Sequence, residues 1–106
     1  MGLSIYLNED QDSVYESNIT HNLTDMAKAS NLYFALWRPE EINCTLAKDI
    51  IILLEYGLEQ LESNPEYFKT FNSVNGWGIY KRFVPFVSDY IQACKKYPDA
   101  IIEVSR

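Results

Sequence analysis

The sequence predicts an α+β fold of four to five helices with a small antiparallel sheet, formed by an N-terminal hairpin and a C-terminal strand. Apolar and polar residues alternate near the start of the chain, as in a strand that is buried on one face. The long middle part repeats apolar residues at helical spacing, and a short β-branched run follows near the end. With 106 residues, the chain has the length of one domain, residues 1–106, around one hydrophobic core.

The strand signals lie at the two ends of the chain. Residues 3–7 alternate apolar and polar side chains, and the polar run 8–13 is typical of a turn. Residues 14–17 then predict the returning strand of a hairpin. Residues 100–104, which follow the break at Pro98, predict a third strand beside that hairpin.

Two short helices are expected after the hairpin. Thr20 is suited to cap the first, and Asn31 favours a left-handed residue at its end. The second covers residues 32–36. It stops before Arg38, because a residue that precedes a proline avoids the α conformation.

The longest predicted helix begins at Leu46, with Thr45 as its cap. For four turns its apolar residues mark one face, namely Ile50, Leu53, Leu54, Gly57, Leu58 and Leu61. A short helix follows, with Asn64 as its cap, Pro65 in its first turn and an end near Phe71.

The last predicted helix follows a glycine-containing segment and is amphipathic. Its apolar residues are Val84, Val87, Ile91 and Cys94 on one face, together with Phe83 and Tyr90. Pro85 lies near its beginning and removes the amide hydrogen bond to the carbonyl of Lys81. We therefore expect a kink at that point.

The net charge of the chain limits the classes of partner that it is expected to bind. Fifteen acidic and nine basic residues give a formal net charge of −6. This charge repels polyphosphate backbones, so direct nucleic-acid binding is not expected. A small anionic ligand is compatible with it where basic residues such as Arg38, Lys81 and Arg82 face the ligand.

The start of the chain has no basic leader, and no apolar run approaches the roughly 20 residues of a membrane span. We therefore expect a cytoplasmic protein without a membrane partner. Cys44 and Cys94 lack CxxC spacing, and cytosolic thiols stay reduced, so buried free thiols are favoured over a disulfide. No recognised metal-ligand spacing surrounds the single histidine, and neither a metal nor a cofactor is expected.

Several segments together resemble a known group of proteins. They are NITHNL at residues 18–23, LWRPEE at 36–41, NGWGIY at 75–80, and the tail from residue 90 to the final VSR. With these segments the chain resembles a family of small uncharacterised bacteriophage and prophage proteins over most of its length. The resemblance implies a setting inside a bacterial cell, where small accessory proteins often interfere with host defence or metabolism. It implies no catalytic residues.

The first candidate binding segment lies where the hairpin is expected to meet the first helix. Asn18, Thr20, His21 and Asn22 offer side-chain donors beside helix amides, a combination suited to a phosphate, carboxylate or ribose hydroxyl. In the alternative interpretation, Thr20 caps the helix and its neighbours satisfy the loop backbone. A general base at His21 lacks a sequence-local partner, so no catalytic residue is assigned.

Trp37 and Arg38 form the second candidate segment. Arg38 could grip a phosphate or carboxylate through two hydrogen bonds while Trp37 stacks on a base or ring. The alternative, which we favour, is structural: Trp37 closes the core and Arg38 forms an internal ion pair. Acidic residues after Pro39 suit a helix start without a further purpose.

The third candidate segment is NGWGIY. Asn75 and Gly76 are typical of a turn, Gly78 permits a close backbone approach, and Trp77 and Tyr80 could wall a pocket. A turn that merely reverses the chain and buries the indole is the alternative. The second glycine favours the pocket, because glycine at a helix start is costly unless its conformation or missing side chain is used.

A charged face on the longest helix is formed by Asp49, Glu55, Glu59 and Glu62. A solvated surface is the favoured interpretation, and a docking patch or a nucleic-acid mimic is the alternative.

Three functions follow, in order of preference. The first is a non-enzymatic binding protein that captures a small polar or nucleotide-like ligand between the three candidate segments, and so sequesters a host signalling molecule. The second is a protein-protein inhibitor or adaptor that acts on a host protein through the acidic helix face. The third is an enzyme built on His21 and a nearby glutamate.

Overall fold

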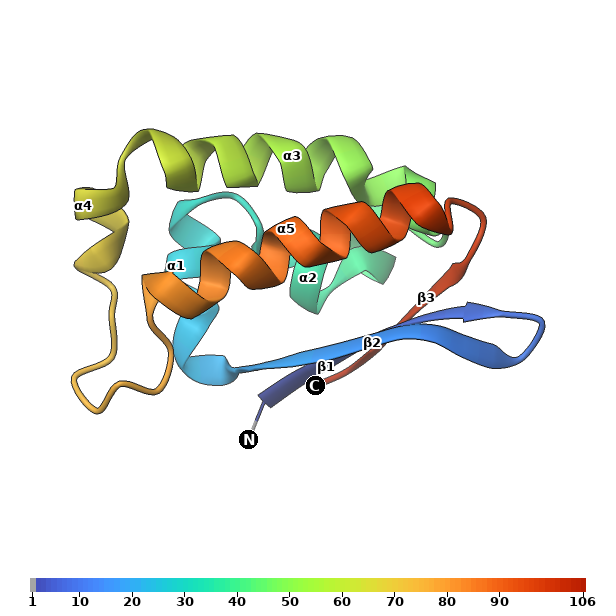
Figure 1. The fold of residues 1–106 in the computed structure, drawn as a ribbon, viewed down its shortest axis with the longest axis horizontal. Coiled ribbons are helices and arrows are strands. Elements are labelled where there is room, and N and C mark those ends of the chain that lie inside the picture. Colours follow the sequence, from blue (N-terminus) through green and yellow to red (C-terminus); the bar gives the residue numbers. More distant parts are fainter. Residues whose placement is uncertain (1) are drawn as a thin grey trace.

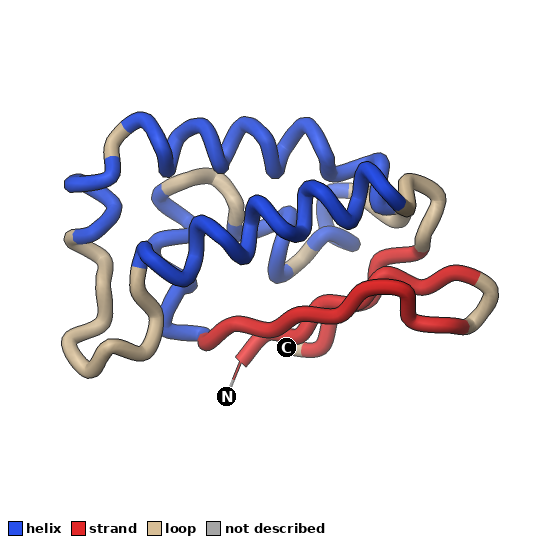
Figure 2. The backbone as a smooth tube through the Cα atoms, in the orientation of Figure 1, coloured by secondary structure: helices blue, strands red, loops and turns tan. Residues whose placement is uncertain are grey.

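Three strands and five α-helices make up the part of the chain that the computed structural model describes, residues 2–106 (Figure 1). The strands are β1 (Gly2–Glu9), β2 (Asp12–Thr20) and β3 (Ile101–Ser105). The helices are α1 (Thr24–Ala29), α2 (Tyr33–Trp37), α3 (Ala47–Ser63), α4 (Pro65–Lys69) and α5 (Tyr80–Lys96), with 3₁₀ turns at His21–Leu23 and Pro39–Ile42. The helices gather on one face of the sheet, as Figure 2 shows. The predicted α+β class with its terminal sheet is confirmed.

The sheet has β1 at its centre, with β2 and β3 antiparallel on either side. Alternate residues of β1 are fully buried beneath the helices, namely Leu3, Ile5 and Leu7. The hairpin turn is shorter than predicted, because Asp10 and Gln11 alone connect the two strands, with φ of 50° and 72°. Such a two-residue turn matches the strand twist. Gly2 of β1 pairs with Thr20, so β2 extends to Thr20, three residues beyond the predicted strand.

The buried face of α3 is narrower than predicted. Ile50, Leu54, Gly57 and Leu61 are buried, but Leu53 is 39% exposed. The prediction that Leu53 faces the core is therefore wrong. Residues 50, 54, 57 and 61 share one stripe of the helix, and Leu53 lies at the side of this stripe.

The prediction that Thr45 caps α3 is also wrong. The backbone N–H groups of Leu46 and Thr45 both donate to the Asp49 carboxylate, at 2.9 and 3.1 Å, so the cap comes from inside the first turn. These two hydrogen bonds hold the pKa of the Asp49 carboxyl below its ordinary value, because they stabilise the charged form. Asp49 thus has a local structural role.

The short helices follow their predictions closely. Asn31 has a φ of 64°, the left-handed conformation predicted for it. Asn64 occupies the cap position of α4, although its side chain makes no capping hydrogen bond, and α4 ends at Lys69, two residues before Phe71. Within residues 2–106, every helix is too short or too polar to cross a bilayer.

The helix α5 supplies much of the core. It begins at Tyr80, before the apolar residues that predicted it, and carries Pro85 inside its second turn. Its buried residues are Phe83, Phe86, Val87, Tyr90, Ile91, Ala93 and Cys94. The ring of Tyr15 on β2 stacks on that of Tyr90, with ring centroids 6.0 Å apart. This stacked pair packs β2 against α5.

Tyr90→Phe is expected to stabilise the protein by about 1 kcal/mol, because a buried hydroxyl without a hydrogen bond costs free energy. The Tyr90 hydroxyl is buried without a partner among residues 2–106, and burial raises its pKa. Urea unfolding measures the change. Tyr56→Phe, at an exposed position, is the matched control and should leave the free energy of unfolding unchanged. A marked loss of stability in Tyr90→Phe would contradict the expectation.

The two cysteines are buried and free, as predicted. Burial raises the pKa of the Cys94 thiol to about 12 and raises that of Cys44 as well, so both thiols stay protonated at pH 8. We expect negligible reaction with a disulfide reagent at pH 8 until urea unfolds the chain, when both thiols react. Burial raises the pKa of the Cys94 thiol in the folded chain above its unfolded value of about 9. The stability that comes from burying this protonated thiol is therefore lost as pH rises from about 9 toward 12. Rapid labelling of either thiol in the native protein would contradict the burial.

Candidate functional site

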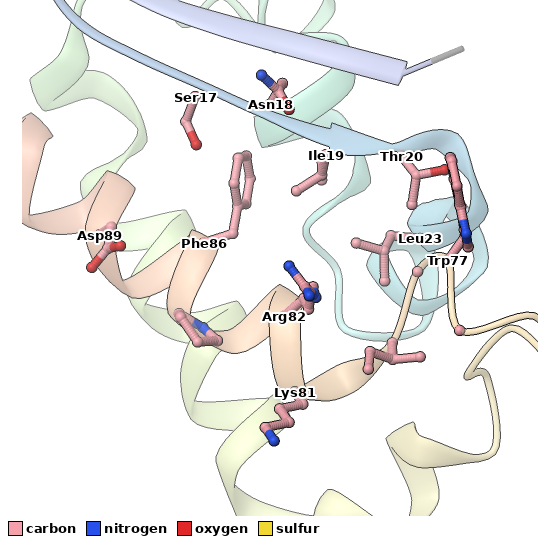
Figure 3. Close-up of a pocket in the computed structure, with 14 residues that line it drawn as sticks. Ser17, Asn18, Ile19, Thr20, Leu23, Trp77, Lys81, Arg82, Phe86 and Asp89 are labelled. Atoms are coloured by element: carbon pink, nitrogen blue, oxygen red, sulfur yellow. The ribbon is translucent and has the colours of Figure 1, made fainter.

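A groove of about 850 Å³ lies between β2 and the first half of α5 (Figure 3). The two elements touch where Tyr15 stacks on Tyr90, and the groove opens beyond that contact. Residues 17–20 of β2 form one wall, and residues 76–79 close one end. Phe86, which is buried, and Leu23 contribute apolar surface.

Two of the three candidate segments meet beside this groove. The side-chain amide of Asn22 donates to the carbonyl of Trp77 at 2.9 Å. Gly78 is buried with a φ of +100°, and a Cβ atom there would lie 2.7 Å from the Cβ of Asn22. The missing side chain of Gly78 is therefore what lets the two segments approach, as the close-approach interpretation expects.

The loop between α4 and α5 presents an indole to solvent. The Asn75 carboxamide oxygen accepts hydrogen bonds from the backbone N–H of Trp77 at 2.9 Å and from the Ser73 hydroxyl at 2.5 Å. Gly76 has a φ of +78°, which completes the turn. Trp77 is 70% exposed and lines the groove, so the interpretation that buried it is wrong.

The opposite wall of the groove carries two cations. Lys81 and Arg82 are exposed and line the groove, and within residues 2–106 neither forms an ion pair. Figure 3 shows Arg82 reaching toward β2, while Lys81 points away from it. Asp89 lines the part of the groove beyond Phe86. The groove is therefore positive at the end near the loop and negative at the other.

Of the other residues in the first and third segments, Asn18 and Thr20 line the groove, whereas His21 and Tyr80 do not. The Thr20 hydroxyl accepts from the backbone N–H of Asn22 at 3.2 Å and caps the 3₁₀ turn. His21 lies outside the groove, with its ring 6.2 Å from that of Trp37 and its Nε2 atom buried without a partner in the described chain. The Tyr80 hydroxyl donates to the carbonyl of Leu61 at 2.8 Å, so this side chain points to α3 and does not wall the groove.

Trp37 and Arg38 also lie outside the groove. Trp37 is 3% exposed and stacks on Tyr33, with centroids 5.7 Å apart. Arg38 donates to the Tyr33 hydroxyl and to the Glu41 carboxylate, each at 3.1 Å. The hollow predicted to join all three segments therefore joins two of them, and the structural interpretation of Trp37 and Arg38 fits their contacts.

The LWRPEE segment contacts the final residue of the chain instead. Arg106 donates to the carbonyl of Trp37 at 2.7 Å and forms an ion pair with Glu40 at 3.0 Å. These contacts hold the end of β3 against the turn that follows α2.

The groove includes residues to which the sequence analysis gave no site role. Ser17, Ile19, Pro85, Phe86 and Asp89 all line it. Lys81 and Arg82 were identified by charge alone. Ile19 lies beyond the predicted strand end, whereas Pro85, Phe86 and Asp89 lie within the predicted helix. These residues were missed because the packing of β2 against α5, which forms the groove, is not recorded in a local pattern.

The acidic face of α3 also carries exposed apolar residues. Ile52 is 77% exposed and Tyr56, one turn further, is 52% exposed. Glu59 and Glu62 are exposed beside them, whereas Glu55 forms an ion pair with Lys95 at 2.9 Å. In residues 2–106 no three His, Cys, Asp or Glu side chains gather as metal ligands would.

No protein-family model matches this chain, and neither a curated protein sequence nor a solved structure matches it. The phage-family resemblance therefore stays a prediction.

Proposed function

We propose that this protein is a non-enzymatic binding protein that captures a small anionic ligand in the groove between β2 and α5. The observation that carries the proposal is the pair Lys81 and Arg82, which form no ion pair with any residue from 2 to 106 and stand at the wall of a groove of about 850 Å³. A groove of this size lies within the usual range for small-molecule sites. The cations can bind an anion despite the net charge of −6, because the ligand responds to the local field.

Two further features support a polar ligand with a flat or apolar part. The exposed indole of Trp77 borders the groove, and the buried ring of Phe86 forms part of its floor. Ser17 and Thr20 add hydroxyl groups that donate or accept hydrogen bonds. In a bacterial cell, the setting that the phage resemblance implies, such a protein would sequester a host signalling molecule, of which nucleotide-like anions are one class.

Arg82→Gln is expected to weaken anion binding at least tenfold, which is about 1.4 kcal/mol. Thermal denaturation is followed with a panel of inorganic phosphate, nucleoside monophosphates, cyclic nucleotides and sugar phosphates. A ligand at 100 times its dissociation constant adds about 2.7 kcal/mol to the free energy of unfolding. Arg82→Gln should reduce this gain, and Lys96→Gln should not, since it removes the same charge from α5 outside the groove.

The salt dependence provides a second readout. Binding to exposed cations should weaken as ionic strength rises, because salt screens the attraction. If every anion in the panel leaves the melting temperature unchanged at low salt, the proposal fails. Equal losses in Arg82→Gln and Lys96→Gln would show that net charge, rather than the groove, governs binding.

A second candidate function is docking to a basic protein through α3. The observation that favours it is the pair of exposed apolar residues, Ile52 and Tyr56, beside Glu59 and Glu62. Exposed apolar residues rimmed by charge are typical of interaction surfaces. A variant with Glu55, Glu59 and Glu62 changed to Lys should lose capture of a basic host protein from bacterial lysate, and unchanged capture would argue against this surface.

A further inference from the structure

The strand β2 has one side free for hydrogen bonding. In the order β2-β1-β3, β1 pairs with one side of β2, and no strand in residues 2–106 pairs with the other. Such an edge presents unpaired N–H and C=O groups to which another extended chain can add. At nine residues β2 is long enough to serve as a template for a peptide.

The groove follows this free edge. Four consecutive residues of β2, Ser17 to Thr20, line it. Successive side chains of a strand point to opposite faces, and Figure 3 shows Ser17 on the α5 side and Asn18 on the other. A groove that touches all four positions therefore reaches the backbone edge as well as one face. These four residues span about 13 Å, the length of four residues of an added strand.

The walls of the groove complement a particular kind of peptide. Phe86, Pro85 and Ile19 offer apolar surface to the side chains that point into the groove. Arg82 and Lys81 supply positive charge at one end, and Asp89 supplies negative charge at the other. An acidic group is favoured at the first end and disfavoured at the second, so the charges set the placement of the peptide.

We propose that an extended peptide adds to the free edge of β2 as a fourth strand and places a carboxylate against Arg82, with Lys81 adding positive charge at the same end of the groove. The inference rests on the proposed function, because both use the same two cations to hold an anionic group. The further inference identifies the molecule that carries this anionic group as a peptide. A phosphate uses the cations alone, whereas a peptide also pairs with the edge of β2 opposite β1, which no other strand occupies within the described residues.

Three pools of fluorescein-labelled hexapeptides, with valine or threonine at alternate positions, provide the probe. The first pool has a free C-terminal carboxylate and no acidic side chain. The second is amidated and ends in glutamate, and the third is amidated without an acid. Fluorescence anisotropy should show binding of the first or second pool at least tenfold tighter than the third. Comparison of the first and second pools shows whether a C-terminal carboxylate or a side-chain carboxylate is preferred.

Backbone pairing is tested by N-methylation of the tightest member. Amide nitrogens of a strand point alternately to its two sides, so methylation of one alternate set blocks pairing with β2 and methylation of the other set does not. We expect at least a tenfold loss with one set and little change with the other. Amide resonances of residues 17–20 should shift in nuclear magnetic resonance spectra of the intact protein when the peptide is added.

The charge contribution is tested with Arg82→Gln, Lys81→Gln and the control Lys96→Gln. We expect weaker binding of the carboxylate peptide in the first two, more so for Arg82, and unchanged binding in the control. Equal binding of all three pools, or equal losses with both methylated sets, would overturn the inference. If phosphate or nucleotides bind in an Arg82-dependent way while no peptide binds, the inference falls and the proposed function stands. If no probe of either kind binds, both fall.

Discussion

Gly78→Ala is expected to lower the free energy of unfolding by about 3 kcal/mol, from backbone strain and overpacking together. The φ of +100° at Gly78 is a conformation that residues with a side chain rarely adopt. The added methyl group would also lie 2.7 Å from the Cβ of Asn22 and 3.1 Å from its carbonyl carbon. Backbone atoms are among these neighbours, so rotation of a side chain cannot relieve the clash.

The same substitution should weaken ligand binding in the groove. To make room for the methyl group, the loop must move away from Asn22, and the hydrogen bond from Asn22 to the Trp77 carbonyl at 2.9 Å is then lost. Residues 76–79 form one end of the groove, so its shape changes with the loop. Urea unfolding measures the stability, and anion titration measures the binding.

Gly76→Ala is the matched control for this prediction. Gly76 also has a positive φ, +78°, but apart from its two chain neighbours no described residue has a heavy atom within 4 Å of the position that its Cβ would occupy. Its substitution therefore carries backbone strain without a clash, and we expect a loss of about 1 kcal/mol. Equal effects of the two substitutions would show that the contact between Gly78 and Asn22 contributes nothing to stability.

Gly57→Ala is expected to destabilise the protein by about 2 kcal/mol, although alanine normally stabilises a helix interior by about 1 kcal/mol relative to glycine. Gly57 is buried in the middle of α3. A methyl group there would lie 2.3 Å from both Cγ and Cδ2 of Leu32, which is fully buried. The Leu32 backbone is held by hydrogen bonds to Ala27 and from Leu36, at 2.8 and 3.0 Å, so the side chain has little room to withdraw.

A double-mutant cycle with Leu32→Ala tests the cause. Leu32→Ala alone should cost about 2–5 kcal/mol through the cavity that it leaves. In that background the added methyl group fills space, so Gly57→Ala should stabilise by about 0.5–1 kcal/mol and the sign of its effect should reverse. Urea unfolding of the four proteins measures the cycle. An unchanged sign would show that Leu32 does not contact residue 57.

The long helices could be predicted from the sequence because their signal is local. Apolar residues at helical spacing marked α3, and the structure buries Ile50, Leu54 and Leu61 of that face. Leu53 fits the same spacing and is 39% exposed. Periodicity gives the direction of a face, but the width that becomes buried depends on which neighbouring elements cover it.

The candidate site was predicted in part. Asn18, Thr20, Gly76, Trp77 and Gly78 line the groove. They were predicted because turn-forming and aromatic residues gather at segment boundaries. Trp37 was a candidate by the same reasoning, with a core role as the favoured interpretation, and its indole stacks on Tyr33 in the core. An aromatic residue beside a turn is suited to either role, and the packing of distant elements decides between them.

The sequence by itself determined the fold class, the terminal strands, the amphipathic helices and the left-handed Asn31, since each depends on the conformational preferences of a few neighbouring residues. The tertiary structure alone decided the strand order, the meeting of Asn22 with Trp77, and the groove between β2 and α5. These features join residues that are tens of positions apart. Their contacts depend on how the layers pack, and no local pattern records that packing.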